Sequence, residues 1–291
     1  MSWRTIVVSS SAKLDYQLGF LVVRTDTITK VHLNEISVLM LESTAISLTA
    51  SLVSELLKRK IKIVFCDEKR NPCGEVMPYY GSHDTSIKIR KQILWDNATK
   101  AVIWTEVVSD KIRKQSDFLA ELRKQSEADL LKSYLSEMTL GDTTNREGHA
   151  AKVYFNAVFG MRFTRAEENP TNAALNYGYT IILSAFNREV VNNGYMTQLG
   201  IFHDNMFNPF NLSSDIMEPF RVLVDRKVYS MRPKKLEHEE KVELVNLLNE
   251  EVYIADRKEY VNNAIKIYVK SVLDALSEND SSMIRFYKNE L

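Results

Sequence analysis

Short alternations of apolar and polar positions, typical of β-strands, occupy the first eighty residues of the chain. The segments WRTIVVSS, KLDYQLGFLVVRTD, ITKVHL and ISVLMLES are rich in Val, Ile, Leu and Thr, and polar turns separate them. SLTASLVSELLKRK carries leucines at helical spacing and predicts one helix, and IKIVFCD after it predicts a buried strand. Turn residues gather in EKRNPCGEVMPYYGSHD. We therefore expect a domain boundary between Gly81 and Asp84.

From about residue 85 onward the apolar positions recur with the period of an α-helix. The longest run, SIKIRKQILWDNATKAVIWTEVVSDKIRKQSDFLAELRKQ, contains neither Gly nor Pro. Further helices are predicted in SEADLLKSYLSEM, NREGHAAKVYFNAVFG, PTNAALNYGYTIILSAFNREVV, LSSDIMEPFRVLVDRKVYSM, EHEEKVELVNLLNEEV and RKEYVNNAIKIYVKSVLDALSE. The pattern predicts an α+β protein, with a small β-rich domain at residues 1–82 and a larger all-helical domain at residues 83–291.

Composition adds little about partners. The chain has 38 Lys and Arg against 38 Asp and Glu, with 45% hydrophobic and 26% charged residues, as in an ordinary globular protein. Binding to nucleic acid would need basic residues that are gathered locally. Such clusters could bind phosphates or could simply be solvated faces, and they occur at Lys58-Arg59-Lys60, Lys88-Ile89-Arg90-Lys91, Lys111-Ile112-Arg113-Lys114 and Arg232-Pro233-Lys234-Lys235.

The cysteines and the apolar runs bear on the compartment. Cys66 and Cys73 lie seven residues apart, which fits neither a CxxC zinc knuckle nor a disulfide framework, so we expect two unpaired thiols. The N-terminus has too short an apolar run for a secretory signal, and no stretch has the roughly 18 uninterrupted apolar residues of a membrane span. We expect a soluble, cytoplasmic protein without a membrane partner.

The segment TNREGHAAKVYF raises a question about Glu147. Thr144 followed three residues later by Glu147 is a capping box, the signature of a helix start. Gly148 comes next in the first helical turn, where glycine costs about 1 kcal/mol relative to alanine. A close approach by another group would explain that glycine, so Glu147 is either a helix cap or a residue that serves chemistry.

A second acidic pair lies in NLSSDIMEPFRVLVD. Ser213 or Ser214 could cap a helix there, and the i, i+3 spacing of Asp215 and Glu218 would place both carboxylates on one face near its N-terminus. Acidic residues in a first turn also complement the helix dipole without any further role, and Arg221 could simply pair with Glu218.

His203, in LGIFHDN, precedes this acidic pair and follows an apolar run. Taken singly, Glu147, His203 and Glu218 each have a structural explanation, but together they could bind a divalent ion. Carboxylates suit Mg²⁺ or Mn²⁺, and the imidazole favours Mn²⁺. The chain contains no GxGxxG, P-loop, GxSxG or HExxH motif that would indicate other chemistry.

Four segments in order, NREGHAAKVYF, FTRAEENPTNAALNYGY, LGIFHDN and DIMEPFRVLVD, resemble the CRISPR-associated spacer integrases, the metal-dependent DNA nucleases of CRISPR adaptation. The compact length is most similar to the type II form. The resemblance implies that Glu147, His203 and Glu218 are the catalytic metal ligands and that Asp215 supports them. Relatives often have aspartate at the third place, and Glu218 reaches one methylene further.

The same resemblance implies supporting roles elsewhere. Arg165, Asn172, Asn176 and Tyr177 match motif positions of the family, although Asn176 and Tyr177 could instead brace the core. With Glu147 as a ligand, Gly148 would leave room for a DNA backbone or for the water shell of the metal.

The activity that the resemblance implies is transesterification. The 3′-hydroxyl of a short double-stranded DNA fragment attacks a phosphodiester of the CRISPR repeat, and water in place of the hydroxyl gives nuclease activity. A homodimer through the β-rich domain and a small ferredoxin-like companion protein are implied as well. Two other readings stay open: a catalytically silent DNA-binding scaffold, and a general structure-selective nuclease acting on branched DNA.

Overall fold

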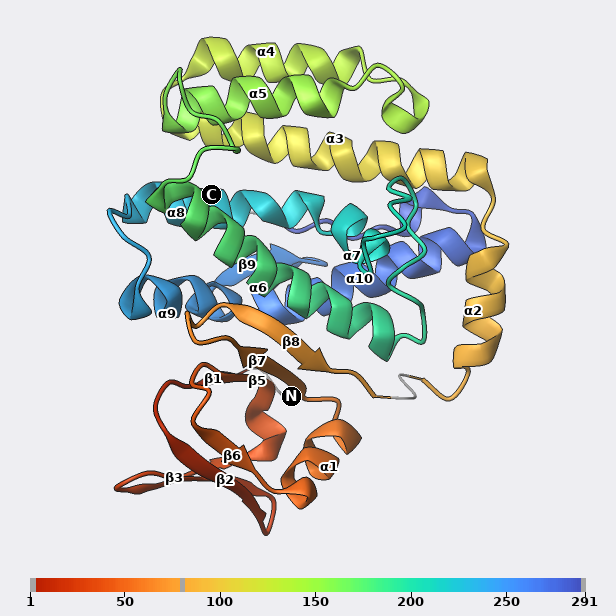
Figure 1. The fold of residues 1–291 in the computed structure, drawn as a ribbon. Helices are drawn as coiled ribbons and strands as arrows, with labels where there is room; N and C mark the ends of the chain where they lie inside the picture. The colour runs from red at the N-terminus through yellow and green to blue at the C-terminus, as the bar shows by residue number, and fades with distance from the viewer. Residues whose placement is uncertain (1–3, 79–81, 289–291) are drawn as a thin grey trace.

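A computed structural model of the chain describes residues 4–78 and 82–288, which form an α+β protein. Figure 1 shows the strands of the N-terminal region gathered at one end and helices making up most of the remainder. The fold class expected from the sequence is therefore confirmed.

Two small sheets and one helix build the N-terminal region. The first sheet has the order β1-β5-β7-β8, parallel except for β8, and the second has the order β4-β3-β2-β6. Within the described residues the elements are β1 (Arg4–Val8), β2 (Ala12–Gln17), β3 (Phe20–Arg24), β4 (Ile28–His32), β5 (Ile36–Leu41), β6 (Ile46–Leu48), α1 (Ala50–Lys58), β7 (Lys62–Cys66) and β8 (Pro72–Val76).

Strand β8 lies in the segment that the sequence pattern assigned to turns. It is the edge strand of its sheet and begins with Pro72, which has no backbone N–H to donate. Proline is tolerated at the first residue of an edge strand, so the turn-like composition did not prevent strand formation.

The first sheet is buried on both faces. Along β5 successive side chains point to opposite faces, as in any strand. Leu39 and Leu41 pack with α1 and the second sheet, whereas Val38 and Met40 pack with the helices that follow. A strand buried on both sides explains the uninterrupted apolar run ISVLML.

This shared sheet joins the two regions. Between β8 and the first helix after it lie residues 77–84, which include the expected boundary, and residues 79–81 are outside the described part. The division into residues 1–82 and 83–291 stays a proposal, supported by the change from strands to helices at this connection.

Helices dominate the rest of the chain and surround a large apolar core. α3 packs on α4 and α5, and α6 packs on α8, α9 and α10. The elements are α2 (Thr85–Ile93), α3 (Asn97–Glu121), α4 (Gln125–Ser136), α5 (Arg146–Phe159), α6 (Pro170–Asn192), α7 (Asn211–Ile216), the 3₁₀ turn η3 (Glu218–Phe220), α8 (Arg221–Met231), α9 (His238–Asn246), β9 (Glu251–Ile254), β10 (Arg257–Tyr260) and α10 (Val261–Glu278).

The hairpin β9–β10 corrects the expectation of an all-helical second region. The sequence pattern predicts that one helix ends at residue 252 and that the next begins at residue 257, but residues 251–254 and 257–260 form two antiparallel strands. Ala255 and Asp256 join them with φ of 50° and 59°. Two consecutive positive φ values give the tight turn whose twist matches a hairpin. Val252 and Ile254 alternate into the core, which anchors one side of β9.

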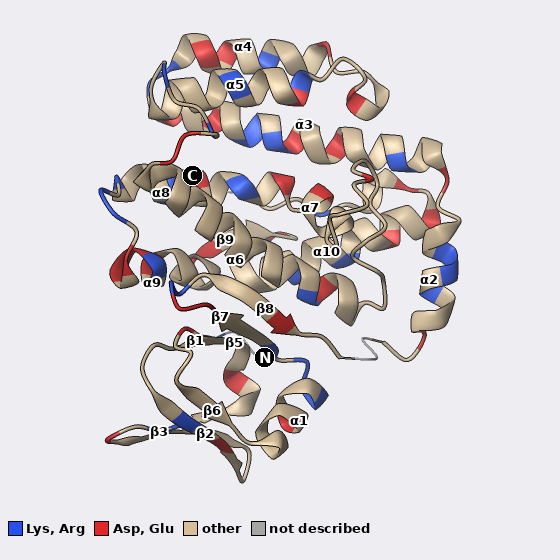
Figure 2. Cartoon of the chain, viewed as in Figure 1, with Lys and Arg blue, Asp and Glu red and all other residues tan. Residues whose placement is uncertain are grey.

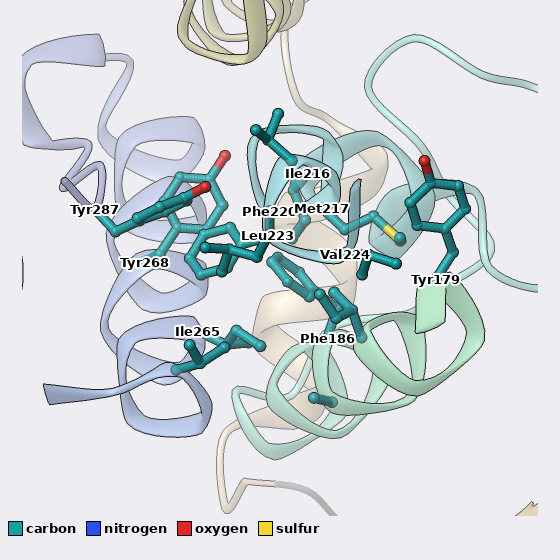
Figure 3. Close-up of a cluster of buried hydrophobic side chains, with 14 of the residues drawn as sticks. Tyr179, Phe186, Ile216, Met217, Phe220, Leu223, Val224, Ile265, Tyr268 and Tyr287 are labelled. Carbon is teal, nitrogen blue, oxygen red and sulfur yellow. The ribbon is translucent and has the colours of Figure 1, made fainter. Parts of the chain in front are cut away.

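The core around η3 positions the candidate site. Figure 3 shows side chains from α6, α7, η3, α8 and α10 packed together around the ring of Phe220. The ring centroids of Phe220 and Tyr287 are 4.5 Å apart, and the Tyr287 hydroxyl donates a 3.0 Å hydrogen bond to the carbonyl of Pro219. The turn that carries Glu218 is therefore fixed from the inside of the molecule.

Two sequence expectations concern cysteines and membranes. Cys66 and Cys73 are both free, and burial raises the pKa of the Cys66 thiol to about 12. Across residues 4–78 and 82–288, no helix has the length and apolarity needed to span a bilayer.

Candidate metal centre

Helix α5 begins one residue later than the capping-box pattern predicts. Asn145, not Thr144, is the N-cap residue, with φ of 53°. The carboxylate of Asp142 accepts hydrogen bonds from the backbone N–H groups of Arg146 at 2.7 Å and Glu147 at 3.0 Å. These partners satisfy the exposed N–H groups of the first turn, so the side chain of Glu147 is not used as a cap.

Gly148 serves the cap itself. Its N–H donates to Oδ1 of Asn145 at 3.2 Å. A Cβ at this position would lie 2.7 Å from the same Oδ1 atom, closer than real Cβ contacts. The close approach suspected from the sequence is thus with Asn145, and the structure gives this local reason for glycine.

The acidic pair at residues 215 and 218 does not share one helix face. α7 begins at Asn211 with Phe210 as its N-cap residue, so Ser213 and Ser214 lie inside the helix and do not cap it. Asp215 belongs to α7, and Glu218 starts the separate turn η3. The two carboxylates consequently have different partners.

Asp215 holds the loop that carries His203. Its fully buried carboxylate accepts from the backbone N–H groups of Ile201 at 2.8 Å, Phe202 at 2.9 Å and His203 at 3.2 Å, and it also bonds Nδ1 of the His203 ring. A carboxylate saturated in this way orients the imidazole and leaves Nε2 for another ligand.

The close packing of the His203 loop requires the glycine of LGIFHDN. A Cβ on Gly200 would clash with the backbone carbonyl oxygen of His203 and would lie 2.7 Å from Oδ2 of Asp215. Only glycine lets the loop approach α7 closely enough for Asp215 to bond three successive backbone groups.

Aromatic rings fix the other side of His203. Phe202 stacks on Trp104 of α3 with centroids 4.3 Å apart, and the imidazole stands edge-on to both rings. The His203 side chain is half exposed. The hydrogen bond with Asp215 raises the pKa of His203; burial opposes this, and the carboxylates of Asp215, Glu218 and Glu147 add to the increase.

Glu218 is buried between two cations. Arg221 donates Nε to its Oε1 at 2.7 Å, and Lys111 donates Nζ to its Oε2 at 2.5 Å. Burial alone would raise the pKa of Glu218, but Arg221 and Lys111 outweigh that effect and lower the pKa to about 2. Glu218 is therefore ionised at any physiological pH.

Lys111 also donates Nζ to Oε1 of Glu147. Burial would lower the pKa of Lys111, but the carboxylates of Glu218 and Glu147 raise it above its usual value. One nitrogen atom thus donates hydrogen bonds to both carboxylates, so a single ion at that point would reach both. Within the basic cluster at residues 111–114, Lys111 and Lys114 accordingly do not belong to a solvated or phosphate-binding face, because both are buried in ion pairs, whereas Arg113 is exposed.

The predicted ligands line one cavity of about 260 Å³. Glu147 comes from α5, Glu218 from η3 and His203 from the loop before α7, while α3 forms a wall. The lining consists of Trp104, Lys111, Gln115, Glu147, Ala151, Phe155, Arg165, Tyr179, Phe202, His203, Glu218, Arg221 and Asp225.

The supporting residues divide between this cavity and the opposite side of α6. Arg165 lines the cavity and donates to Oδ1 of Asn172 and Oδ1 of Asn176, each at 2.5 Å. Tyr177 lies away from it, with its hydroxyl 3.8 Å from Sδ of Met40 in the first sheet. Tyr177 therefore braces the joint between the regions.

Sequence reasoning missed Lys111, Tyr179 and Asp225. Tyr179 donates its hydroxyl to Oδ1 of Asp225, and burial raises the pKa of Asp225 to about 6. The sequence could have indicated Asp225, because Glu218, Arg221 and Asp225 have the i, i+3, i+7 spacing that places side chains on one face of a helix. For Lys111 the signal is a polar residue on the apolar stripe of α3, four residues after Val107.

The carboxylate and imidazole groups at this site are of the kinds that bind a hard divalent ion. Two carboxylates converge on one point, and an imidazole oriented by Asp215 faces the same cavity. Within the described ranges, however, no group of three or more His, Cys, Asp and Glu side chains is arranged to hold a metal. Lys111 stands between the carboxylates, so binding of an ion requires this ammonium to move.

Charges of both signs are distributed along the helices around this site, as Figure 2 shows for α3 and α5. The balance of charge in the composition therefore also holds within α3 and within α5, each of which carries residues of both signs.

Comparison with known proteins gives a consistent result. Residues 5–253 match the family described as CRISPR associated protein Cas1. The CRISPR-associated endonuclease Cas1 of Neisseria meningitidis serogroup C is 35% identical over 229 residues, covering 78% of this chain and 75% of the relative. A CRISPR-associated endonuclease Cas1 of Francisella tularensis subsp. novicida is 24% identical, covering 83% of this chain and 82% of the relative.

Solved structures share the fold. A Cas1 protein from Thermotoga maritima superposes with a TM-score of 0.75 at 19% identity, covering 94% of this chain and 97% of that one. A casposase bound to integration product gives 0.72 at 17% identity, covering 97% and 93%. A chain of a Cas6-RT-Cas1–Cas2 complex gives 0.73 at 20% identity, covering 97% of this chain and 36% of that one.

Proposed function

The chain belongs to the Cas1 family of CRISPR-associated proteins, and from this premise we propose that it is a metal-dependent DNA nuclease and integrase of CRISPR adaptation. The observation that carries the proposal is the convergence of the Glu147 and Glu218 carboxylates on one point of a cavity that His203 also lines. Relatives of this chain are named endonucleases, and a structural neighbour is a casposase bound to its integration product.

Glu147, His203 and Glu218 would hold the ion, either Mg²⁺ or Mn²⁺. When bound, such an ion lowers the pKa of an attacking hydroxyl and polarises a phosphoryl oxygen. Asp215 keeps the His203 ring in one orientation through Nδ1, and Arg221 keeps Glu218 ionised and fixed. Arg165 supplies a positive charge at the cavity wall, where a phosphate of the substrate would lie.

The reaction is an exchange of phosphate esters. The 3′-oxygen of the incoming fragment forms a bond to phosphorus, the bond from phosphorus to a 3′-oxygen of the target strand breaks, and the hydroxyl proton is balanced by protonation of the leaving oxygen. Water in place of the fragment gives cleavage. No covalent protein intermediate is needed for such an exchange.

Double-stranded DNA with 3′ ends and the CRISPR repeat are the proposed substrates. A homodimer through the N-terminal region and a small ferredoxin-like companion protein are the proposed partners. Neighbours whose titles name Cas1–Cas2 complexes support the companion. In the N-terminal region two large apolar side chains are exposed: Leu18, in the turn between β2 and β3, is 94% exposed, and Ile28, at the start of β4, is 60% exposed. The mass in solution, measured by light scattering, tests the dimer.

A strand-transfer assay tests the activity. A labelled duplex with 3′-hydroxyl ends is incubated with a repeat-bearing target or an unrelated branched duplex, with Mn²⁺ or with chelator. Joining to the repeat that requires metal is expected. Glu147→Gln should reduce it about 1,000-fold, since loss of a metal ligand removes roughly 4 kcal/mol of transition-state stabilisation. Glu127→Gln, in the first turn of α4 and outside the lining of the cavity, is the matched control.

Each other outcome has a defined meaning. DNA binding without any metal-dependent transfer or cleavage would indicate a silent scaffold. Cleavage of the unrelated branched duplex at the same rate, with no joining to the repeat, would indicate a general structure-selective nuclease. Joining by Glu147→Gln at the parental rate would refute the assignment of the site.

A further inference from the structure

Lys111 occupies the point that the two proposed metal ligands share. Its side chain is only 8% exposed, and its Nζ is bonded to Oε1 of Glu147 and, at 2.5 Å, to Oε2 of Glu218. A divalent ion that binds both carboxylates needs the same position. The ammonium and the ion therefore compete for the same two ligands.

The charges in direct contact already balance without a metal. Glu147 and Glu218 face Lys111 and Arg221 in ion pairs. Adding a divalent ion beside a fixed ammonium would place like charges a few ångströms apart at a buried site, where their repulsion is much stronger than in water. Arg221 is bonded to Glu218 from its other side, so Lys111 is the cation that has to leave.

A second position for the ammonium lies one helical turn further along α3. Gln115 is four residues after Lys111, lines the same cavity, and is 1% exposed. Its Oε1 is buried and, among the described residues, has no hydrogen-bond donor. Buried polar atoms of native proteins are nearly always paired, so this acceptor points to a donor that reaches it in another state.

We propose that Lys111 has two positions: it bridges Glu147 and Glu218 in the metal-free protein, and it moves to Oε1 of Gln115 when Mg²⁺ or Mn²⁺ enters. The proposal rests on the metal site of the proposed function. The flexible four-carbon stem of lysine permits the movement within one cavity. Lys111 thereby keeps the acidic pair neutralised until the metal binds, and Gln115 lowers the cost of displacing it.

Calorimetric titration of the full chain with MnCl₂ tests this. Lys111→Met keeps the length of the side chain and removes the competing charge, so it should tighten the Kd for Mn²⁺ by about tenfold or more. Gln115→Leu removes the receiving acceptor and should weaken binding by about threefold or more. In the double variant the Gln115 effect should vanish, because no ammonium remains to be received.

Two controls separate this from other causes. Lys152→Met removes an exposed positive charge from α5 that does not bond either carboxylate, and it should leave the Kd unchanged. An equal gain there would mean that overall charge, not competition, sets the affinity. Glu147→Gln should abolish binding in the parental chain and in Lys111→Met alike.

The failures are distinguishable. If the parental chain binds Mn²⁺ through Glu147 but Lys111→Met has the same Kd within twofold, the two-position lysine is wrong and the metal site stands. If the parental chain shows no Mn²⁺ binding that depends on Glu147, the proposed metal site is wrong, and the two-position lysine is wrong as well. If Lys111→Met does not fold, Gln115→Leu alone decides, and an unchanged Kd overturns the proposal.

Discussion

The N-terminal region and the helical region bury different chemistry. The N-terminal core is built from Leu and Ile side chains of two sheets and α1, and the buried charged residues described there, Glu42 and Lys62, lie beside helices of the other region. The helical region encloses Lys111, Asp215, Glu218, Asp225 and the pair of Asp110 and Lys114. Burying charge disfavours folding unless each charge is paired.

The difference indicates a division of roles. An apolar core stabilises a fold because it removes apolar surface from water. Clustered buried charges with shifted pKa values are typical of sites where chemistry is performed. Substitutions in the first region should change the free energy of unfolding, and substitutions in the second should change metal binding and its pH dependence.

Leu39→Ala is expected to have the largest effect on stability. Leu39 is fully buried in β5 within the N-terminal core, so its truncation should lower the free energy of unfolding by about 3 kcal/mol. Denaturant titration measures this change. Calorimetry should give an unchanged Kd for Mn²⁺, and a shift of more than about threefold would break the distinction between the two regions.

Asp225→Asn should alter the pH dependence of stability. Burial raises the pKa of Asp225 from 3.8 to about 6. The raised pKa means that its contribution is fully present below pH 3.8 and is lost as pH rises through about 6. Relative to Asp225→Asn, the parental chain should lose about 3 kcal/mol across that interval. Denaturant titrations with chelator from pH 4.5 to 7.5 measure most of this change, and parallel curves would contradict it.

Asp215→Asn should weaken the metal site with a moderate effect. Loss of the charge removes the partner that orients His203, and such outer partners typically contribute 10- to 100-fold, or about 2 kcal/mol, in metal affinity. Calorimetry with Mn²⁺ measures the Kd. Asp204→Asn, at an exposed neighbouring residue, is the control and should behave as the parental chain does.

Tyr287→Phe is expected to have the smallest effect. It removes the 3.0 Å hydrogen bond to the carbonyl of Pro219, which should lower the free energy of unfolding by about 1 kcal/mol. Because Pro219 adjoins Glu218, a small weakening of Mn²⁺ binding should accompany it. Tyr195→Phe loses a comparable hydrogen bond to Ser277 away from the site, and it should change stability without changing the Kd.

The elements with strong periodicity were predictable. Strands of the N-terminal region and the long helices α3, α6 and α10 follow from their patterns, because one or both faces of each are buried over several repeats. Strand β8 and the hairpin β9–β10 were missed, since short elements carry few repeats and their composition resembles turns or helices.

The candidate ligands were predictable from local motifs, but their partners were not. Glu147, His203 and Glu218 each stand in a segment with its own signature, and Gly148 indicated a close approach at the start of α5. The capping box at Thr144 and the shared helix face of Asp215 and Glu218 were wrong. At the start of α5, Asp142 accepts from the backbone N–H of Glu147, and Asn145 is the N-cap residue. The shared face fails because α7 ends at Ile216 and Glu218 begins the separate turn η3.

The sequence by itself determined the α+β class and the membership of the family, and it predicted the residues of the proposed metal site. Those properties follow from the periodicity of apolar residues and from motifs of contiguous residues. Only the tertiary structure decided that Lys111 stands between two carboxylates 36 and 107 residues away. It also decided that Oε1 of Gln115, in the same cavity, has no hydrogen-bond partner among the described residues. Such contacts depend on how α3 crosses α5 and η3, and no local pattern encodes the crossing of helices far apart in the chain.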